Sequence, residues 1–356
     1  MERAAGEERG AGMPVAPTEP PAPDAPIASA RRLADEVLFP SALDVDCTGR
    51  FPAYQLDALA AAGLYGILAP RESGGLGADP PTYARVLEEL ASGCLTTTFV
   101  WAQHHNAVRA LAAAPPALRD RFLPDLAAGR VRAGVAFGSL RRPGPPLLVA
   151  TRDPGGWLLD GTAPFVTGWG HLDVLHVAAR TADGAVAWLL ADGEDGPTLS
   201  SAPLGLAAVS ASATVALTFS GHFVKGDRLT LLEPFEQWQR RDRSALRPNG
   251  ALALGVARRC ARLLGSELIA REVERARARL EGADDAGVPR ARAEATALAT
   301  RAAAELVVAR GSRAVGLADD AQRLYREAMF LLVFGQTADI RAEQLGVMRA
   351  LPRGRA

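Results

Sequence analysis

The chain has 356 residues, its 40 lysines and arginines balance 40 aspartates and glutamates, and 48% of its residues are hydrophobic. This neutral balance argues against a nucleic-acid-binding protein and against an anionic membrane surface as the main partner, because both need a basic surface. No apolar run approaches the roughly 20 residues that cross a bilayer. Three widely spaced cysteines exclude a disulfide framework and indicate a reducing compartment. The sequence therefore predicts a cytoplasmic protein without a nucleic-acid or membrane partner.

The first part of the chain is predicted to be a tail followed by helices. Residues 1–27 hold almost no large apolar side chain, so they bury too little surface to offset the loss of chain entropy, and we predict a disordered tail. Over residues 28–130 the apolar side chains recur at helical spacing, and prolines and glycines separate the segments. This range is predicted to form an N-terminal helical domain.

The pattern changes over residues 131–234, where short alternating or β-branched runs are separated by glycine, proline and aspartate. The predicted strands are residues 147–150, 157–159, 174–179, 186–190, 214–219 and 223–224. Many short strands between frequent turns are typical of an antiparallel barrel or sandwich. Helical spacing returns over residues 235–356, with helices expected at residues 252–264, 268–280, 291–314 and 321–334. The predicted fold class is α+β.

The histidines give no metal site from their spacing. His104 and His105 are adjacent in a predicted helix, where neighbouring side chains point about 100° apart, so both cannot easily bind one metal ion. We expect one of them in a polar contact and the other exposed. His171, His176 and His222 lie in the strand region without ligand spacing. Composition and pattern alone therefore predict the architecture but no reaction.

Six segments, taken in chain order, point to a family. Residues 63–77 read GLYGILAPRESGGLG and are the most specific of them. The others are VLEELA at 86–91, FLPDLAAG at 122–129, WLLDG with FVTG at 157–168, SATVALTFSGHFV at 212–224 and RLYREA at 323–328. Over residues 28 to 345 the chain resembles the acyl-CoA dehydrogenases. This resemblance implies helical domains on either side of a central antiparallel barrel or sandwich, with a shortened C-terminal bundle, and it also implies a homo-oligomer.

The resemblance implies FAD as cofactor, with the flavin between the β-domain and the C-terminal helices. The residues that correspond to the two flavin-binding segments of the family are Phe137, Gly138, Ser139, Phe165, Val166 and Thr167. An aromatic wall suits a flat ring system, and a few hydrogen-bond donors stabilise its reduced form. Residues 140–146 correspond to the family's phosphate-binding loop. Arg141 or Arg142 in this segment is the candidate to neutralise the pyrophosphate. The alternative is that the segment is a plain exposed loop without such a role.

The family reaction removes a proton from the α-carbon of an acyl thioester, which needs a carboxylate because that proton is too weakly acidic for water. The usual glutamate position holds Gly335 in this chain. The position on an earlier helix that some members use falls at residues 245–247, again without a carboxylate. Asp242, one turn upstream, is the candidate base, although an exposed residue at a helix start would also explain it. Asp339 and Glu343 are expected to face solvent.

The resemblance leaves three functions open. The first is an FAD-dependent α,β-dehydrogenation of an acyl thioester of coenzyme A or a carrier protein, with an unknown electron acceptor. The second is a flavin-dependent monooxygenase of the same fold, which needs no such base. The third is a non-catalytic scaffold, favoured by Gly335 and by the segment at Arg277, which keeps the arginine of the family's R..FG element but lacks its Phe-Gly. In the family that element reaches the FAD of the partner subunit.

Overall fold

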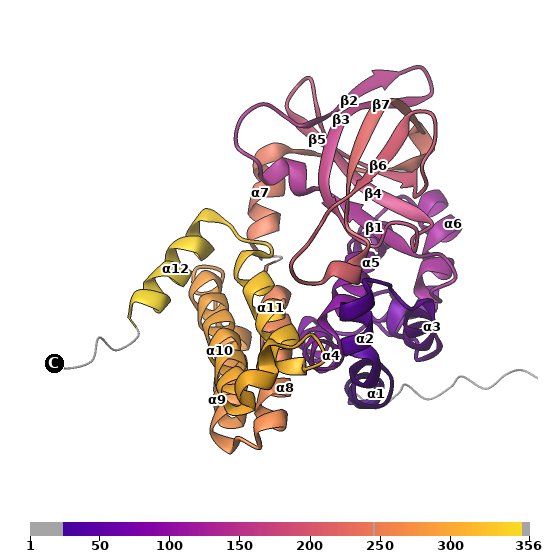
Figure 1. The fold of residues 1–356 in the computed structure, drawn as a ribbon. Helices are drawn as coiled ribbons and strands as arrows, with labels where there is room; N and C mark the ends of the chain where they lie inside the picture. The colour runs from indigo at the N-terminus through magenta and orange to yellow at the C-terminus, as the bar shows by residue number, and fades with distance from the viewer. Residues whose placement is uncertain (1–23, 245, 351–356) are drawn as a thin grey trace, which may run out of the picture.

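The N-terminal part of the protein is helical. A computed structural model describes residues 24–244 and 246–350. Its first elements are α1 (Ala25–Leu33), the π-helical η1 (Ala34–Leu38), α2 (Phe39–Thr48), α3 (Ala53–Ala61), α4 (Pro80–Gly93), α5 (Leu95–Ala112) and α6 (Pro116–Ala127). The start of α4 is well defined, since the Asp79 carboxylate accepts a hydrogen bond from the backbone N–H of Thr82 and Pro80 occupies the first turn. Figure 1 shows this helical part beneath the strands.

The predicted tail extends three residues too far. Helix α1 begins at Ala25, with Pro26 in its first turn, where a missing N–H leaves no hydrogen bond unmade. Ala30 is buried because α1 packs against α4, and this contact holds a helix that composition alone does not favour. The rest of the predicted tail, residues 1–23, lies outside the described residues.

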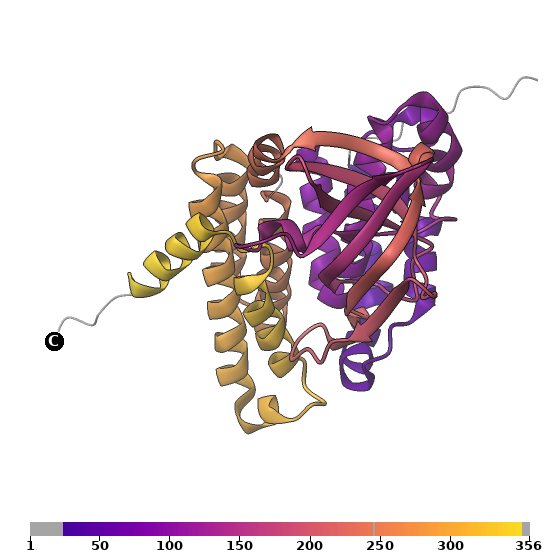
Figure 2. The ribbon, with the colours of Figure 1, turned by 90° about the horizontal axis from the view of Figure 1, so that it is seen from above.

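The middle part is a sheet of eight strands. They are β1 (Ala133–Ala136), β2 (Leu148–Asp153), β3 (Gly156–Val166), β4 (Val174–Thr181), β5 (Ala185–Asp192), β6 (Leu199–Pro203), β7 (Val215–Lys225) and β8 (Leu229–Pro234). The strand order is β6-β7-β3-β2-β4-β5-β8, and β1 pairs with β4. Seen from above, the strands lie across the N-terminal helices and beside the C-terminal ones (Figure 2). The sequence missed β1, β6 and β8, whose short runs carry little pattern of their own.

The sheet differs from the expectation in two details, while the α+β fold class is confirmed. It is mixed rather than purely antiparallel, because β1 and β2 both pair in parallel with β4. The two segments predicted at 214–219 and 223–224 are one strand, β7, paired with β3. Gly221, at φ +61°, lies where the register shifts. Such a bulge bends a strand without ending it.

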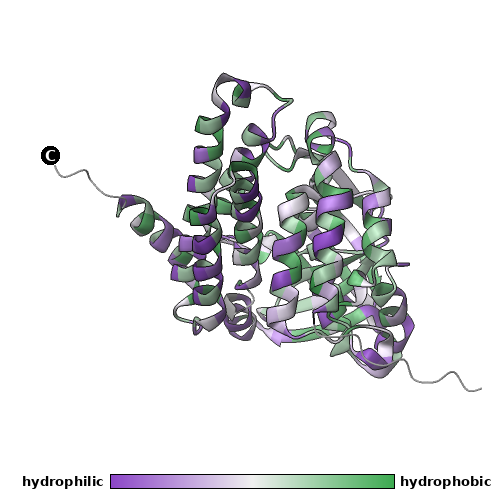
Figure 3. Cartoon of the chain, turned by 90° about the horizontal axis from the view of Figure 1, so that it is seen from below, coloured by the Kyte–Doolittle hydropathy of each residue, from purple (hydrophilic) through white to green (hydrophobic). Residues whose placement is uncertain are grey.

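The C-terminal part is again helical, as predicted. Its helices are α7 (Phe235–Ser244), α8 (Pro248–Leu264), α9 (Glu267–Gly282), α10 (Val288–Arg310), α11 (Asp320–Val333) and α12 (Ala338–Arg349). Helix α12 was not predicted, and it buries only Ile340 and Gln344. Figure 3 shows hydrophobic and hydrophilic residues on each of the long helices. No helix in the described ranges is both long and apolar enough to pass through a bilayer.

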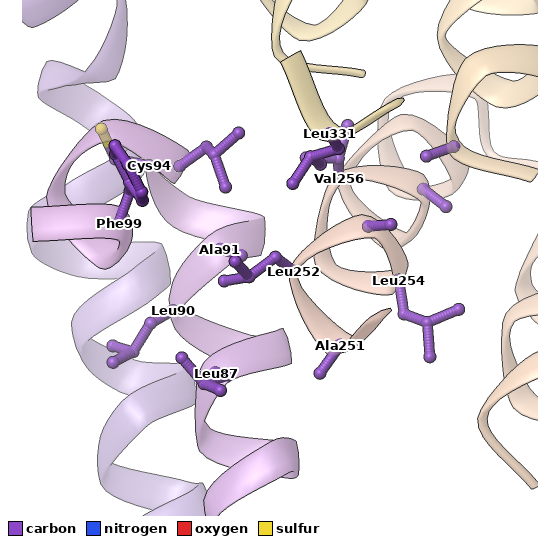
Figure 4. Packing of buried hydrophobic residues seen from close by; sticks show 14 of the residues in the cluster. Leu87, Leu90, Ala91, Cys94, Phe99, Ala251, Leu252, Leu254, Val256 and Leu331 are labelled. Atoms are coloured by element: carbon purple, nitrogen blue, oxygen red, sulfur yellow. The ribbon is translucent and has the colours of Figure 1, made fainter. Parts of the chain in front are cut away.

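The two helical parts share one core. Ala91 of α4 lies next to Leu252 of α8, and Leu87 and Ala251 lie in the same core (Figure 4). The approach of the two helices is close at Gly255, where any Cβ would lie 2.4 Å from the carbonyl oxygen of Glu88. The predicted three domains, divided at residues 130 and 234, stay a prediction. In the structure β1 begins at Ala133 and α7 begins directly after β8.

Candidate functional site

A cavity of about 600 Å³ lies where the sheet meets α4 and α5 on one side and α7, α8 and α11 on the other. Much of its wall is aromatic, formed by Tyr83, Phe99, Phe137, Phe165, Trp188, Trp238, Phe330 and Phe334. The charged side chains of the wall, among the described residues, are Arg109, Arg141, Arg142, Arg241 and Asp242. A hollow that is mostly apolar and has a few converging polar groups is the usual form of a small-molecule site.

The first predicted flavin-binding segment follows β1. Phe137 and Gly138 line the cavity, and Gly138 begins the short 3-10 helix η4 (Gly138–Arg141). A Cβ at position 138 would lie 3.4 Å from the carbonyl oxygen of Pro164, so the segment packs closely on the end of β3. Ser139 instead lines an adjoining cavity, and its buried hydroxyl has no hydrogen-bond partner in the described structure. A buried hydroxyl without a partner points to a ligand or a water at this place.

The second predicted segment ends β3. Phe165 has φ +57°, a left-handed backbone that bulky residues rarely adopt. The residue lines the cavity and is 58% exposed. Backbone strain of this kind collects at functional sites. Thr167 also lines the cavity, with its hydroxyl 3.0 Å from that of Thr214. Val166 is buried in the sheet core and is not among the residues that line either cavity.

The two positions that the resemblance assigns to the base both contribute to the cavity wall without a carboxylate. Leu246, from the stretch 245–247, lines the cavity, and so does Gly335. Gly335 has φ +59°, and a Cβ there would lie 2.6 Å from the side-chain nitrogen of Asn249. The buried Arg292 donates hydrogen bonds to the carbonyl oxygens of Phe334 and Gly335, at 3.0 and 3.1 Å. The chain after α11 is therefore held in a conformation that suits glycine.

Asp242 lies in the last turn of α7, so the expectation of an exposed residue at a helix start is wrong. Its side chain is 12% exposed and lines the cavity, because it follows Trp238 by one turn on the same helix face. Both carboxylate oxygens accept hydrogen bonds from Arg141, at 2.7 and 2.8 Å. Asp242 is thus in the right cavity for a base, but it is held by a bidentate ion pair.

The adjoining cavity carries more positive than negative charge. Arg141, Arg142 and Arg180 line it together with Asp242 and Asp339. Ser139 and Thr337 also line it, and Thr337 precedes the first residue of α12. Positive charge beside a helix N-terminus is the arrangement that binds phosphate groups in other proteins. Arg142 is exposed, while Arg141 is already paired with a carboxylate. Of the two predicted pyrophosphate partners, Arg142 is therefore the one whose charge is available.

The prediction for the two adjacent histidines is half wrong. His104 makes the expected polar contacts: its Nδ1 accepts from the backbone N–H of Ala133 at 3.1 Å, and its Nε2 lies 3.2 Å from the carbonyl oxygen of Leu126. His105 is not exposed, because α5 is covered on this side by α4, and only 2% of its surface is accessible. Burial lowers the pKa of His104 to about 3, so its imidazole is neutral.

Another buried histidine makes a polar contact that no sequence pattern suggested. Nδ1 of His176 lies 2.7 Å from the side-chain oxygen of Asn106, and its Nε2 lies 2.8 Å from the Thr230 hydroxyl. Burial, aided by the charge of Arg241, lowers its pKa to about 3. His176 therefore anchors Asn106, which lines the cavity.

These buried histidines predict a strong pH dependence of stability. His104 and His176 stay neutral in the folded protein, but in the unfolded chain they bind protons near pH 6.5, so acid favours unfolding. Each should lower the free energy of unfolding by about 1.4 kcal/mol per pH unit between about pH 6 and pH 5, where most carboxylates remain ionised. Urea unfolding at stepped pH measures this slope. His176→Gln should reduce the slope by about 1.4 kcal/mol per pH unit, the contribution of one histidine. An unchanged slope would contradict the conclusion that His176 is neutral in the folded protein.

Arg277, which the resemblance assigns to the FAD of a partner subunit, is paired within its own chain. Its side chain is 6% exposed, and it donates to both carboxylate oxygens of Glu88, at 2.6 and 2.7 Å. Burial alone would lower the pKa of its guanidinium, but the hydrogen bonds and charges of Glu88 and Glu274 hold it above the usual range. In this fold Arg277 ties α9 to α4 within its own subunit.

No group of histidines, cysteines and acidic residues in the described ranges could hold a metal ion.

Comparisons with known proteins agree with this architecture. Residues 24–130 match the family described as acyl-CoA dehydrogenase, N-terminal domain. The Probable acyl-CoA dehydrogenase fadE25 of Mycobacterium leprae is 29% identical over 211 residues, which are 57% of this chain and 54% of that protein. The chain thus spans about half the length of the curated relatives it matches.

Two solved structures match nearly the whole chain. The butyryl-CoA dehydrogenase of Megasphaera elsdenii has a TM-score of 0.78 at 17% identity and covers 92% of this chain and 98% of its own. The chain has the acyl-CoA dehydrogenase fold. A glutaryl-CoA dehydrogenase of Mycobacterium smegmatis in complex with FADH2 has a TM-score of 0.77 at 18% identity, covering 94% of this chain and 96% of its own.

Because the chain has the acyl-CoA dehydrogenase fold, its cavities can be tested for a fit to the FADH2 named with one of these structures. The unpartnered Ser139 hydroxyl, the exposed and strained Phe165 and the net positive charge of the adjoining cavity each suit part of such a group. The family resemblance was the signal for Phe137 and Thr167. Trp238 was missed, although its spacing of four residues from Asp242 could have indicated a shared helix face.

Proposed function

We propose that this protein binds FAD across the two adjoining cavities and catalyses the α,β-dehydrogenation of an acyl thioester. The observation that carries the proposal is that Phe137, Gly138, Phe165 and Thr167, separated by the whole of β2 and most of β3, line one cavity of about 600 Å³. These residues and Ser139 would hold the flavin, and Arg142 would face its phosphates. FAD would supply the acceptor for the hydride that leaves the β-carbon.

Asp242 is the residue of this chain that we assign to the α-proton. It is the one carboxylate among the described residues that line the cavity. Because both of its oxygens accept from Arg141, the side chain is held in place, and each oxygen keeps a second lone pair that could take the proton. Arg141 therefore positions the base.

One observation favours a second function. Gly335 and Leu246 leave both family base positions without a carboxylate, and Asp242 is ion-paired. A flavin-dependent monooxygenase of the same fold needs no base at these positions. The same residues would hold the flavin in that case, and the cavity would take a different substrate.

A spectrum of the purified protein tests the proposal. We expect visible flavin absorption that is bleached when a straight-chain acyl-CoA is added without oxygen. A protein that takes up no FAD would overturn the proposal and leave the non-catalytic scaffold. Bound flavin that no acyl thioester bleaches, but that consumes oxygen once reduced, would favour the monooxygenase.

The Ser139 hydroxyl gives a site-specific version of this test. Ser139→Ala removes one hydrogen bond to the cofactor and should weaken FAD binding about tenfold, as a bond of about 1.4 kcal/mol predicts. Titration of the apoprotein with FAD, followed by tryptophan fluorescence, measures the change. Ser220→Ala, on an exposed part of β7, is the matched control and should bind FAD as the unchanged protein does. Equal affinity in both variants would exclude Ser139 as a flavin contact.

A further inference from the structure

One wall of the main cavity is polar although an alkyl chain would need it apolar. Helix α5 presents Phe99, Ala102, Gln103 and Asn106 to the cavity at helical spacing, and His105 joins them from the adjacent face. The amide of Gln103 donates to the carbonyl oxygen of Phe99 at 3.0 Å, so it is satisfied within the helix. His105, in contrast, has no hydrogen-bond partner for its polar atoms within the described structure.

His105 is buried and its polar atoms are unmatched. It is 2% exposed, it lines the cavity, and neither ring nitrogen has a hydrogen-bond partner in the described part of the chain. His104, the preceding residue, has both nitrogens engaged. Leaving a buried donor and a buried acceptor unmatched is costly, and native structures rarely do so unless a ligand or water supplies the partner.

The surroundings of His105 fix its orientation and its charge. The ring packs edge-on against Trp101, with centroids 4.4 Å apart, and against Tyr83, at 5.2 Å. Burial first, and then the neighbouring His104 and Arg109, hold its pKa well below the usual value, and no carboxylate offsets them. The imidazole is therefore neutral and presents one N–H donor and one bare nitrogen acceptor.

Asn106 adds a second polar group to the same wall. Its side chain is held from behind by His176, which is itself bonded to Thr230. Phenylalanines close the neighbouring part of the cavity: Phe99 lies 5.1 Å from Phe330 and 5.0 Å from Phe334, both edge-on. The cavity therefore offers a short apolar region beside a wall that can hydrogen-bond.

We propose that His105 and Asn106 select an acyl group that carries a neutral polar substituent, such as a hydroxyl, which both donates and accepts a hydrogen bond. The inference rests on the proposed function, because the ligand is taken to be the acyl part of a thioester. His105 is then a specificity-determining residue rather than a base. A hydroxyl on the acyl chain can pair with one ring nitrogen of His105 as either donor or acceptor, whereas an unsubstituted alkyl chain can pair with neither.

Matched thioesters test this assignment without relying on turnover. We would measure by calorimetry the binding of butyryl-CoA and hexanoyl-CoA, and of their terminally hydroxylated counterparts, to the FAD-loaded protein. The hydroxylated member of at least one pair should bind about tenfold more tightly or better. In His105→Phe this preference should vanish or reverse, while His105→Gln should keep part of it. His222→Phe, on β7 outside the cavity, should keep all of it.

The outcomes distinguish a failure of the proposed dehydrogenase function from a failure of the proposed role of His105. If no thioester binds the FAD-loaded protein, both the proposed function and this inference fail. If the paired thioesters bind equally well to the unchanged protein, water satisfies His105 and only the inference fails. If succinyl-CoA binds more tightly than either hydroxylated thioester and loses this advantage in Arg109→Met, the wall selects an anion, and the neutral-substituent proposal is overturned.

Discussion

Asp242→Asn is expected to lower the turnover of an acyl thioester by between about a hundredfold and ten thousandfold, the usual contribution of a general base. The substitution keeps the shape of the side chain and removes its capacity to take the α-proton. The carboxylate is 12% exposed in the last turn of α7, and no other described residue of the cavity wall carries a carboxylate. Rapid-mixing kinetics of flavin bleaching under anaerobic conditions measures the effect on the chemical step.

The matched control is Glu236→Gln on the same helix. Glu236 is exposed and does not line the cavity, so the same change of charge there should leave bleaching unchanged. FAD content should be compared in both variants, because Asp242→Asn also weakens the pairing of Arg141. If Asp242→Asn retains its flavin and bleaches at the original rate, Asp242 is not the base, and the monooxygenase gains support.

The three-part order of the fold could be predicted because its signals are local. The helical spacing of Leu252 to Leu264 lies within one helix, and the turn residues between β4 and β5 are consecutive in the sequence. The short strands β1 and β8 could not be found this way. Each acquires its hydrogen bonds from a strand distant in sequence, β1 from β4 and β8 from β5.

The candidate site was predictable only in part. The resemblance placed Phe137 and Phe165 beside one ligand, and the structure brings both to one cavity. The ion pair between Arg141 and Asp242 spans 101 residues of sequence, so no spacing rule reveals it. The two histidines illustrate the same limit: His104 and His105 look alike in the sequence, and only the packing of α4 and β1 around α5 gives partners to one and none to the other.

Among the proposed substitutions, replacement of the buried Arg277 is expected to lower the stability of the protein most. Arg277→Met should lower the free energy of unfolding by about 3 to 5 kcal/mol, because it leaves the 1% exposed carboxylate of Glu88 with only the longer contact to Arg258, at 3.1 Å. Urea unfolding followed by circular dichroism measures the loss. Arg271→Met, on the same helix in an exposed pair with Glu267, should cost less than about 1 kcal/mol.

A double variant separates two contributions to the cost of Arg277→Met: the lost ion pair with Glu88, and the buried charge of Glu88 that remains without its partner. If the cost of Arg277→Met comes mainly from an uncompensated carboxylate, adding Glu88→Gln should restore part of the stability, so the two effects are not additive. The family pattern instead assigns this arginine to the FAD of a partner subunit. Unchanged stability of Arg277→Met together with weaker FAD binding would favour that assignment, whereas a less stable protein that still binds FAD would establish Arg277 as the link between α9 and α4.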